Sequence, residues 1–385
     1  MLDRHVHTLI GLGPRPVGSP ANQQAADYIR ATFRAAGLDV EEQPYACTAW
    51  EQDFIRLEQE GEQLDAAANA FSLPCDVTAP VISAGTIAQL EAVSAHGKIL
   101  LLYGDLARAP LSAKSWFLKD ERDDHIIQLL EQIQPAALLA PPTSTAYYGH
   151  LTEDWELDLP AATVPPAVAR RLMQNADSAA HLCIAARRIP AMAQNIVART
   201  HGVFEKRIVV CAHFDTKINT PGASDNGGGA AALLALAERI SKGEAGVDLE
   251  FVAFNSEEYL PIGDDEYVRR GEAYFPSIRC AINMDGIGAM LAANSLTAIA
   301  TPEEMEQAIR HVAAEFPGVQ WVEPWPESNH STFSFRGIPA VALSSVGARG
   351  LAHSTADTID VMSADKLEEA VALVERLIQI IVAKA

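Results

Sequence analysis

Acidic and histidine side chains follow short apolar segments of the sequence, at the points where those segments end. The apolar runs cover residues 207–212, 249–254 and 281–284, and each is typical of a buried strand. The polar residues after these runs or in later loops are His213, Asp215, Asp225, Glu257, Glu258, Asp285 and His353. Imidazole and carboxylate groups bind zinc and transfer protons in hydrolysis. Their positions therefore indicate a metal-assisted hydrolytic site.

Each of these residues has a chemical role available to it. Two metal ions roughly 3.5–4 Å apart need one bridging acid and terminal ligands on either side. A suitable ligand set is His213, Asp225, Glu258, Asp285 and His353. Glu257 precedes Glu258 in an extended loop and points the opposite way, so we expect it to be the general base that takes a proton from the attacking water. Asp215 is expected to accept the second N–H of the His213 imidazole and so fix its tautomer.

Taken singly, these signals are common in proteins without a metal site. A His-x-Asp pair at a strand end is usually a hydrogen-bonded surface pair, two adjacent glutamates usually face solvent, and Asp-Gly after a strand is usually a turn. All of them fall at strand ends or in a glycine-rich loop, and this shared placement favours the functional interpretation.

The elements around these residues alternate between strand and helix. Residues 230–240 and 364–382 have helical periodicity, and residues 340–343 form a fourth short apolar run. A further helix is predicted near residues 20–36, with Ser19 as its N-cap. We therefore expect an α/β fold with a mostly parallel, mixed central sheet sandwiched by helices. The carboxyl ends of strands meet in one crevice in such a sheet, which brings the polar residues together.

A chain of 385 residues exceeds the usual size of a single hydrophobic core. Residues 47–197 differ in sequence pattern from the rest of the chain and contain no dense cluster of potential ligands. We predict a discontinuous domain of residues 1–46 and 198–385, interrupted by a smaller inserted domain of residues 47–197.

Composition narrows the classes of function. An apolar content of 49% excludes disorder, and a net charge of −21 argues against nucleic-acid or membrane-surface partners. The acidity suits either solubility or cationic ligands. The five cysteines lack paired spacing, so we expect neither a disulfide framework nor a thiolate zinc site. We found no secretory signal and no membrane-spanning run, and so expect a cytoplasmic protein, or a secreted one if a leader was trimmed.

The polar segments resemble those of the co-catalytic zinc aminopeptidases, which share a fold with the bacterial leucyl aminopeptidases and the glutamate carboxypeptidase and transferrin-receptor group. The matching segments are Ala212-His213-Phe214-Asp215-Thr216, Pro221-Gly222-Ala223-Ser224-Asp225-Asn226-Gly227, Asn255-Ser256-Glu257-Glu258, Asn283-Met284-Asp285 and His353-Ser354-Thr355-Ala356-Asp357-Thr358. The segment Gly13-Pro14-Arg15-Pro16-Val17-Gly18-Ser19-Pro20 is similar to the start of that peptidase domain, so the resemblance covers residues 1–46 and 198–385.

The resemblance implies a zinc-exopeptidase fold, peptide substrates and two Zn²⁺ ions, although Co²⁺ and Mn²⁺ also accept this ligand set. It assigns His213 and Asp285 to one ion, Glu258 and His353 to the other, and Asp225 to the bridge. It also makes Glu257 the base. The inserted residues 47–197 stand where many relatives carry a protease-associated domain, and the likeness is confined to Gly97-Lys98-Ile99-Leu100.

Three departures from the family pattern affect substrate contacts. Ala352 stands where many relatives have a tyrosine that hydrogen-bonds the tetrahedral intermediate, and His330 is our candidate for a replacement donor. The family's Ser-Asp-His segment contains Asn329 in place of the acid. Residues 259–266 are unusually acidic, which suits either a solvated loop or binding of a substrate's α-ammonium group.

The sequence supports a metal-dependent aminopeptidase first, with two alternatives. One is a single-zinc acyl transferase of the glutaminyl cyclase type, which keeps the ligands corresponding to Asp225, Glu258 and His353. The other is a non-catalytic binding protein on the same scaffold, against which the complete ligand set and Glu257 argue. Metal stoichiometry distinguishes the aminopeptidase from the cyclase. The oligomeric state and the preferred N-terminal residue do not follow from the sequence.

Overall fold

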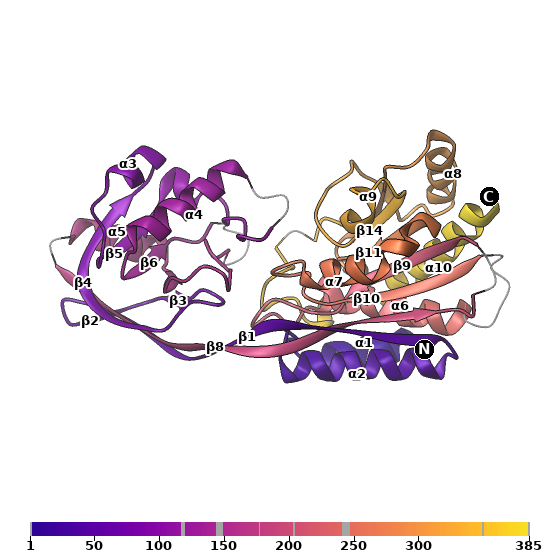
Figure 1. The fold of residues 1–385 in the computed structure, drawn as a ribbon, viewed down its shortest axis with the longest axis horizontal. Helices are drawn as coiled ribbons and strands as arrows, with labels where there is room; N and C mark the ends of the chain where they lie inside the picture. Colours follow the sequence, from indigo (N-terminus) through magenta and orange to yellow (C-terminus); the bar gives the residue numbers. More distant parts are fainter. Residues whose placement is uncertain are drawn as a thin grey trace. The chain divides into compact units, whose positions relative to one another are not determined.

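The fold is described by a computed structural model (Figure 1). The described residues are 2–116, 120–143, 149–176, 178–202, 205–240, 247–348 and 350–383. They form two compact units, one of Met1–Cys47 with Ala191–Ala385 and the other of Thr48–Pro190. The first unit contains every residue of the predicted metal site.

The first unit is built on a mixed, mostly parallel sheet. Its strands, in spatial order, are β13 (Gln320–Trp321), β12 (Ala293–Ile299), β14 (Ala340–Val346), β11 (Ile278–Met284), β9 (Arg207–His213), β10 (Asp248–Phe254) and β8 (Ala179–Arg199). The four central strands β14, β11, β9 and β10 pair in parallel, whereas β12 is antiparallel to β14 and β8 is antiparallel to β10. This arrangement confirms the predicted fold class.

Helices cover both faces of this sheet. One face packs against α1 (Leu2–Gly11), α2 (Pro20–Ala35), α6 (Gly228–Ile240), α8 (Glu303–Ala314) and α10 (Ala364–Ala383). The other packs against α7 (Ile262–Gly271), the 3₁₀ helix η3 (Glu272–Ser277) and α9 (His330–Ser334). Because side chains alternate along a strand, Ile208 and Val210 of β9 enter the first core and Val209 enters the second. Burial on both faces explains why these strands are continuous apolar runs.

The helix α2 shows how local sequence sets the boundaries. Ser19 has an extended backbone, and its side-chain oxygen accepts a hydrogen bond from the backbone N–H of Asn22. Pro20 occupies the first helical position, where its missing N–H costs nothing. Gly37 follows the helix with a φ of 83°. The predicted cap, first residue and terminating glycine of this helix are all present.

The second unit has its own sheet and cores. Its strands are β4 (Cys75–Ala84), β5 (Ile99–Leu102), β6 (Ala137–Ala140), β7 (Ala161–Thr163) and β3 (Ala67–Ala68), with β2 (Glu62–Leu64) paired to β1 (Asp39–Gln59). The helices are α3 (Ile87–Ala92), α4 (Glu121–Ile133) and α5 (Pro166–Gln174). Leu100 packs with α4 on one face, and Leu101 packs with α5 on the other. The long strands β1 and β8 belong to both units, since the boundaries fall within them.

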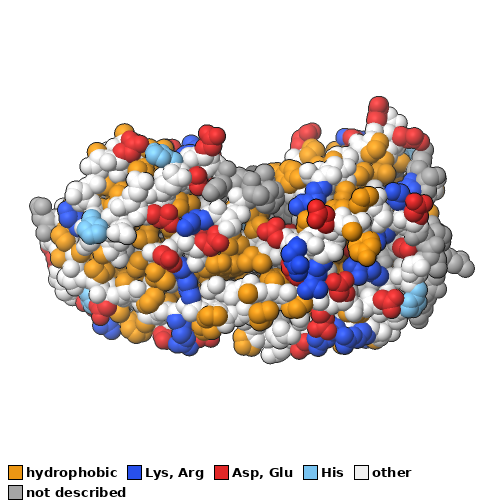
Figure 2. All heavy atoms as spheres, viewed as in Figure 1, with side chains coloured by type: hydrophobic (Ala, Val, Ile, Leu, Met, Phe, Trp, Pro, Cys, Tyr) orange, Lys and Arg blue, Asp and Glu red, His pale blue; other side chains and the backbone are white. Residues whose placement is uncertain are grey.

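Surface charge and helix hydropathy bear on the expected partners. On the face drawn in Figure 2, acidic and basic side chains are interspersed. Among the described residues, no helix is both long enough and apolar enough to cross a bilayer.

Candidate metal centre

The predicted ligands lie at the carboxyl ends of the parallel strands. His213 is the last residue of β9, and Asp285 directly follows β11. Glu258 lies in the loop after β10, and His353 in the segment after β14. Asp225 lies in the turn η2 (Ala223–Gly227), which leads into α6. The shared direction of the strands brings these five residues together from distant parts of the sequence.

The carboxylate of Asp225 lies between the two histidines. Its Oδ1 is 3.3 Å from Nε2 of His213, and its Oδ2 is 3.0 Å from Nε2 of His353. Asp285 Oδ1 lies 3.2 Å from the same nitrogen of His213, and Glu258 Oε2 lies 3.0 Å from that of His353. The site therefore has two halves, each with one imidazole and one carboxylate, joined by Asp225.

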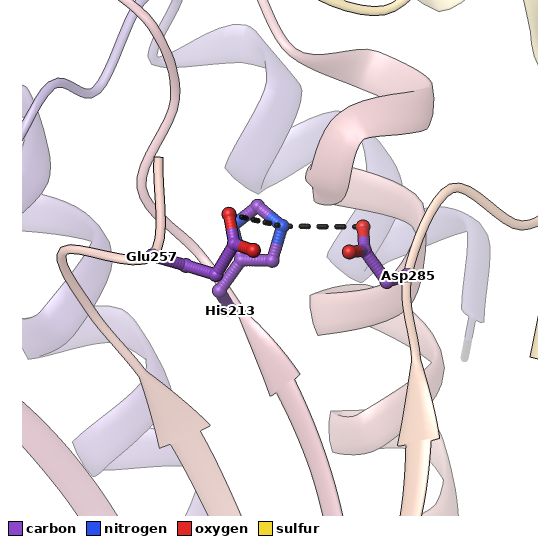
Figure 3. Close-up of side chains that lie close together, drawn as sticks. All are labelled: His213, Glu257 and Asp285. Atoms are coloured by element: carbon purple, nitrogen blue, oxygen red, sulfur yellow. Dashed lines mark hydrogen bonds and ion pairs between the residues drawn. The ribbon is translucent and has the colours of Figure 1, made fainter. Parts of the chain in front are cut away.

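Glu257 faces the half formed by His213 and Asp285. Its Oε2 lies 3.8 Å from His213 Nε2, and Figure 3 shows Glu257 and Asp285 on either side of the imidazole. Its side chain is 18% exposed, whereas that of Glu258 is only 1% exposed. The two adjacent glutamates thus differ in environment, and Glu257 is the one whose side chain is partly open to solvent.

The charges in the site shift the pKa values of its members. Burial alone would lower the pKa of His213, but the charges of Asp285 and Glu257 outweigh it and hold that pKa well above its usual value. Glu258 and Asp225 raise the pKa of His353 in the same way. Burial is the main cause of the raised pKa of Glu257, and Asp285 and Glu258 add to it. The cluster has an excess of buried negative charge that a cation would compensate.

The donor set fits a divalent metal ion. There are two groups of three residues whose donor atoms lie within 4.8 Å of one another. One group is His213, Glu257 and Asp285, and the other is His213, Asp225 and Glu258. Within the described part of the chain, Glu258 Oε1 and His213 Nδ1 are buried without a hydrogen-bond partner. Buried polar atoms normally have a partner, so an unmatched carboxylate oxygen beside an imidazole is consistent with a ligand atom. Nitrogen and oxygen donors of this kind suit zinc.

Asp215 supports the site through the backbone. Its two carboxylate oxygens each accept a hydrogen bond of 3.2 Å, one from the N–H of Glu257 and the other from the N–H of Glu258. Its Oδ1 lies 3.6 Å from His213 Nδ1, which is an ion-pair separation longer than a hydrogen bond. Asp215 therefore fixes the loop of the two glutamates, and its expected hydrogen bond to the imidazole is absent from this geometry.

Two residues hold the turn that carries Asp225. Asp357 is fully buried and accepts hydrogen bonds from the backbone N–H groups of Ser224, at 2.8 Å, and Asp225, at 3.0 Å. Asn226 donates from its side chain to the carbonyl oxygen of Met284, the residue before Asp285. These contacts join the turn to the segments on both sides of it. No local pattern in the sequence marks the contact of Asn226.

His330 lies in α9 and belongs to neither donor group. Its Nε2 donates to the carbonyl oxygen of Trp325 at 2.8 Å, so its buried Nδ1, which has no partner among the described residues, carries the lone pair. Burial lowers the pKa of this imidazole. A neutral His330 in this tautomer would need to rotate before it donated to a substrate oxygen. Its proposed role stays a prediction.

Two of the acidic residues after Glu258, Asp264 and Glu266, already have partners inside the protein. Asp264 is buried and accepts hydrogen bonds from Asn329 and from the hydroxyl of Thr332. Glu266 pairs with Arg269 and Arg270. Residues 259–266 were expected to form either a solvated loop or a site for an ammonium group. Asp264 fits neither expectation. It anchors α9 instead.

Comparisons with known proteins agree with this site. Residues 195–378 match the sequence profile of peptidase family M28. An aminopeptidase from Pseudomonas aeruginosa is 26% identical over 311 residues, which cover 72% of this chain and 54% of that protein. The chain spans about half the length of the first curated relatives it matches. The matched region contains all five predicted ligands and Glu257, and these similarities support the expected resemblance to the zinc aminopeptidases.

Solved structures share the fold over nearly the whole chain. An aminopeptidase from Aneurinibacillus sp. strain AM-1 gives a TM-score of 0.80 at 22% identity, covering 98% of this chain and 93% of that one. A zinc aminopeptidase from Bacillus subtilis gives 0.78 at 21% identity, covering 99% and 94%. A glutaminyl cyclase from Porphyromonas gingivalis is more distant, with a TM-score of 0.53 at 14% identity over 98% and 96%. These similarities confirm the expected fold class, and they extend over residues 47–197, where the sequence showed only a weak likeness.

Proposed function

We propose that this protein is a metal-dependent aminopeptidase that removes N-terminal residues from peptides and uses two zinc ions. The main support is the position of Asp225, whose two oxygens face the two halves of the site at 3.3 and 3.0 Å from their imidazoles. One carboxylate shared by two imidazole–carboxylate pairs is the arrangement that a pair of ions requires. The relatives and structures named above as aminopeptidases support the same reaction.

His213 and Asp285 would hold one ion, Glu258 and His353 the other, and Asp225 both. When bound, the ions would polarise the substrate carbonyl and lower the pKa of water. Glu257 would take a proton from the attacking water and pass it to the amide nitrogen as the carbon–nitrogen bond breaks. Its partial exposure lets it meet water and substrate, while Asp215 fixes its backbone. The water oxygen becomes part of the new carboxylate, and the proton leaves with the amine.

Substituting the two adjacent glutamates separately tests this assignment. Glu257→Gln should keep the wild-type zinc content while turnover of an aminoacyl 4-nitroanilide falls roughly 10²–10⁴-fold, the usual contribution of a general base. Glu258→Gln is the matched control, because it makes the same chemical change one residue away and should lower the zinc content instead. Wild-type turnover in Glu257→Gln would refute the role of this residue as the base.

Substrates with a blocked amine test the exopeptidase part of the proposal. An aminopeptidase should cleave leucyl-4-nitroanilide and leave its N-acetylated form intact, with activity lost on chelation and restored by zinc. Equal cleavage of both substrates would contradict the requirement for a free N-terminus.

A glutaminyl cyclase activity is the second candidate, supported by the fold shared with the cyclase structure. It predicts about one zinc per chain and conversion of N-terminal glutamine to a cyclic product without peptide cleavage. His213 and Asp285 favour the peptidase, since the cyclase pattern requires only Asp225, Glu258 and His353. Elemental analysis together with mass spectrometry of a glutamine-initiated peptide would separate the two activities.

A further inference from the structure

Arg15 is buried beside the candidate metal centre, and within the described residues its guanidinium group donates only to backbone carbonyls. Its side chain is fully buried. Nε donates to Phe214 at 3.1 Å, Nη1 to Gly13 and Pro221 at 2.9 Å each, and Nη2 to Gly222 at 3.0 Å. Among the described residues it forms no ion pair. A buried cation held by carbonyl groups alone is uncommon, because charges are costly to bury unpaired.

These carbonyls belong to the segments on either side of the shared carboxylate. Phe214 lies between His213 and Asp215, at the end of β9. Pro221 and Gly222 lead directly into the turn that carries Asp225. One rigid, planar group therefore fixes the distance between the backbone of the His213 ligand and the backbone that leads to the bridging ligand.

The surrounding packing leaves this connection little freedom. The backbone N–H of Arg15 donates to the hydroxyl of Thr216 at 2.8 Å, and the N–H of Thr216 donates back to the carbonyl of Arg15 at 3.3 Å. Gly222 has a φ of 62°, and a Cβ placed on it would lie 2.2 Å from Cγ2 of Thr216. On the far side, Asp357 binds the N–H of Asp225. The bridging ligand is thus held between Arg15 and Asp357.

The charge of Arg15 has a separate consequence. Burial lowers its pKa to about 10, while the charges of Asp215 and Asp357 oppose that shift, so the group remains a cation at neutral pH. A cation beside the site weakens metal binding by repulsion, whereas a fixed position of Asp225 strengthens it. The two effects have opposite signs, and a substitution can therefore separate them.

We propose that Arg15 is a positioning residue that sets the separation of His213 and Asp225, and so the affinity of the site for its pair of metal ions. The proposal rests on the function proposed above. Lysine keeps the positive charge but cannot donate to Phe214, Pro221 and Gly222 together. Arg15→Lys should therefore weaken zinc binding although the charge is retained.

The test measures zinc affinity by competition with a chromophoric chelator, using the full chain. We expect a 10–100-fold loss of affinity in Arg15→Lys, the usual range for residues that orient metal ligands. Arg188→Met is the matched control, because Arg188 also donates to backbone carbonyls, those of Phe71 and Leu157, but lies in the second unit. It should leave zinc affinity unchanged. Unfolding of the chelated proteins reports any general loss of stability.

Unchanged or tighter zinc binding in folded Arg15→Lys would overturn the proposal, and so would a loss of stability in the chelated protein with no change in affinity. If Arg15→Lys does not fold, Thr216→Val provides the test, since it removes the hydroxyl that accepts from the backbone N–H of Arg15 and so holds this residue in place. It should weaken zinc binding several-fold in a folded protein, and unchanged affinity would overturn the proposal. A wild-type chain that binds two zinc ions but cleaves no aminoacyl substrate would instead contradict the proposed function and leave this inference standing.

Discussion

Asp264 should make the first unit less stable as the pH rises. The carboxyl group is buried, with 8% of the residue exposed, and burial raises its pKa from 3.8 to about 6 although Thr332 and Asn329 donate to it. The folded state therefore binds a proton more tightly than the unfolded state. Stability falls between pH 4 and 6 as this proton is lost, and the full cost is present above pH 6. A shift of this size corresponds to about 3 kcal/mol.

Asp264→Asn removes this cost while it preserves the shape of the side chain. The new amide oxygen can accept from Thr332, and the new amide nitrogen can donate to Asn329, whose buried Oδ1 has no partner among the described residues. We expect the variant to gain stability over wild type as the pH rises from 4 to 7, by about 3 kcal/mol. For domains of 150–250 residues this gain is roughly 6–12 °C in the unfolding temperature.

Calorimetric unfolding of both proteins in chelator, from pH 4 to 7, measures the difference without a contribution from metal release. Asp265→Asn is the matched control, because it makes the same change on the next residue of α7, where the side chain is exposed. It should show a much smaller pH-dependent difference. A difference between Asp264→Asn and wild type that is constant across this range would refute the reasoning, as would one that shrinks with pH.

Three other outcomes follow from contacts in and around the site. Asp357→Asn places an amide donor against the N–H of Asp225 and should weaken zinc binding 10–100-fold in chelator competition; unchanged affinity would show that this contact does not position the ligand. Chelation should lower the unfolding temperature of the first unit, since zinc at 1,000 times its Kd adds about 4 kcal/mol to the free energy of unfolding. An unfolding temperature that does not change on chelation would exclude tight binding. Gly222→Ala should lower both stability and zinc content, because its Cβ would overlap Thr216. Gly337→Ala is the control, because this glycine has a similar φ of 73° but no atom within 4 Å, and it should lower the free energy of unfolding by only about 1–2 kcal/mol. Equal effects of the two substitutions would contradict the clash.

The central sheet could be predicted because its strands are buried on both faces. Runs such as 208–212 are continuous and apolar, and the polar residue at each end marks where the strand leaves the core. The positions of His213 and Asp285 follow from that pattern. The ligand assignments remain predictions, although the structure brings the five side chains together.

Other features have no local signal in the sequence. The strand β8 contains Arg187, Arg188 and Pro190, residues that argue against a strand, and it runs across the boundary between the two units. A boundary within a strand is not marked by a turn or linker, which explains why we placed it at residue 197. The contacts of Arg15 and Asp357 reach across 132–207 residues, so spacing along the chain does not reveal them.

The hydrogen bonds of Arg15 also affect how the protein folds. Those to Phe214, Pro221 and Gly222 join residues 199–207 positions apart, with the whole second unit between them in the sequence. Contacts between such distant residues form late, because the long intervening chain must be closed before they stabilise anything. During synthesis the N-terminal helices emerge first and have no sheet to pack on until β9 to β14 follow. We therefore expect zinc capture to be among the last steps of folding, and refolding of the metal-binding form to be slow.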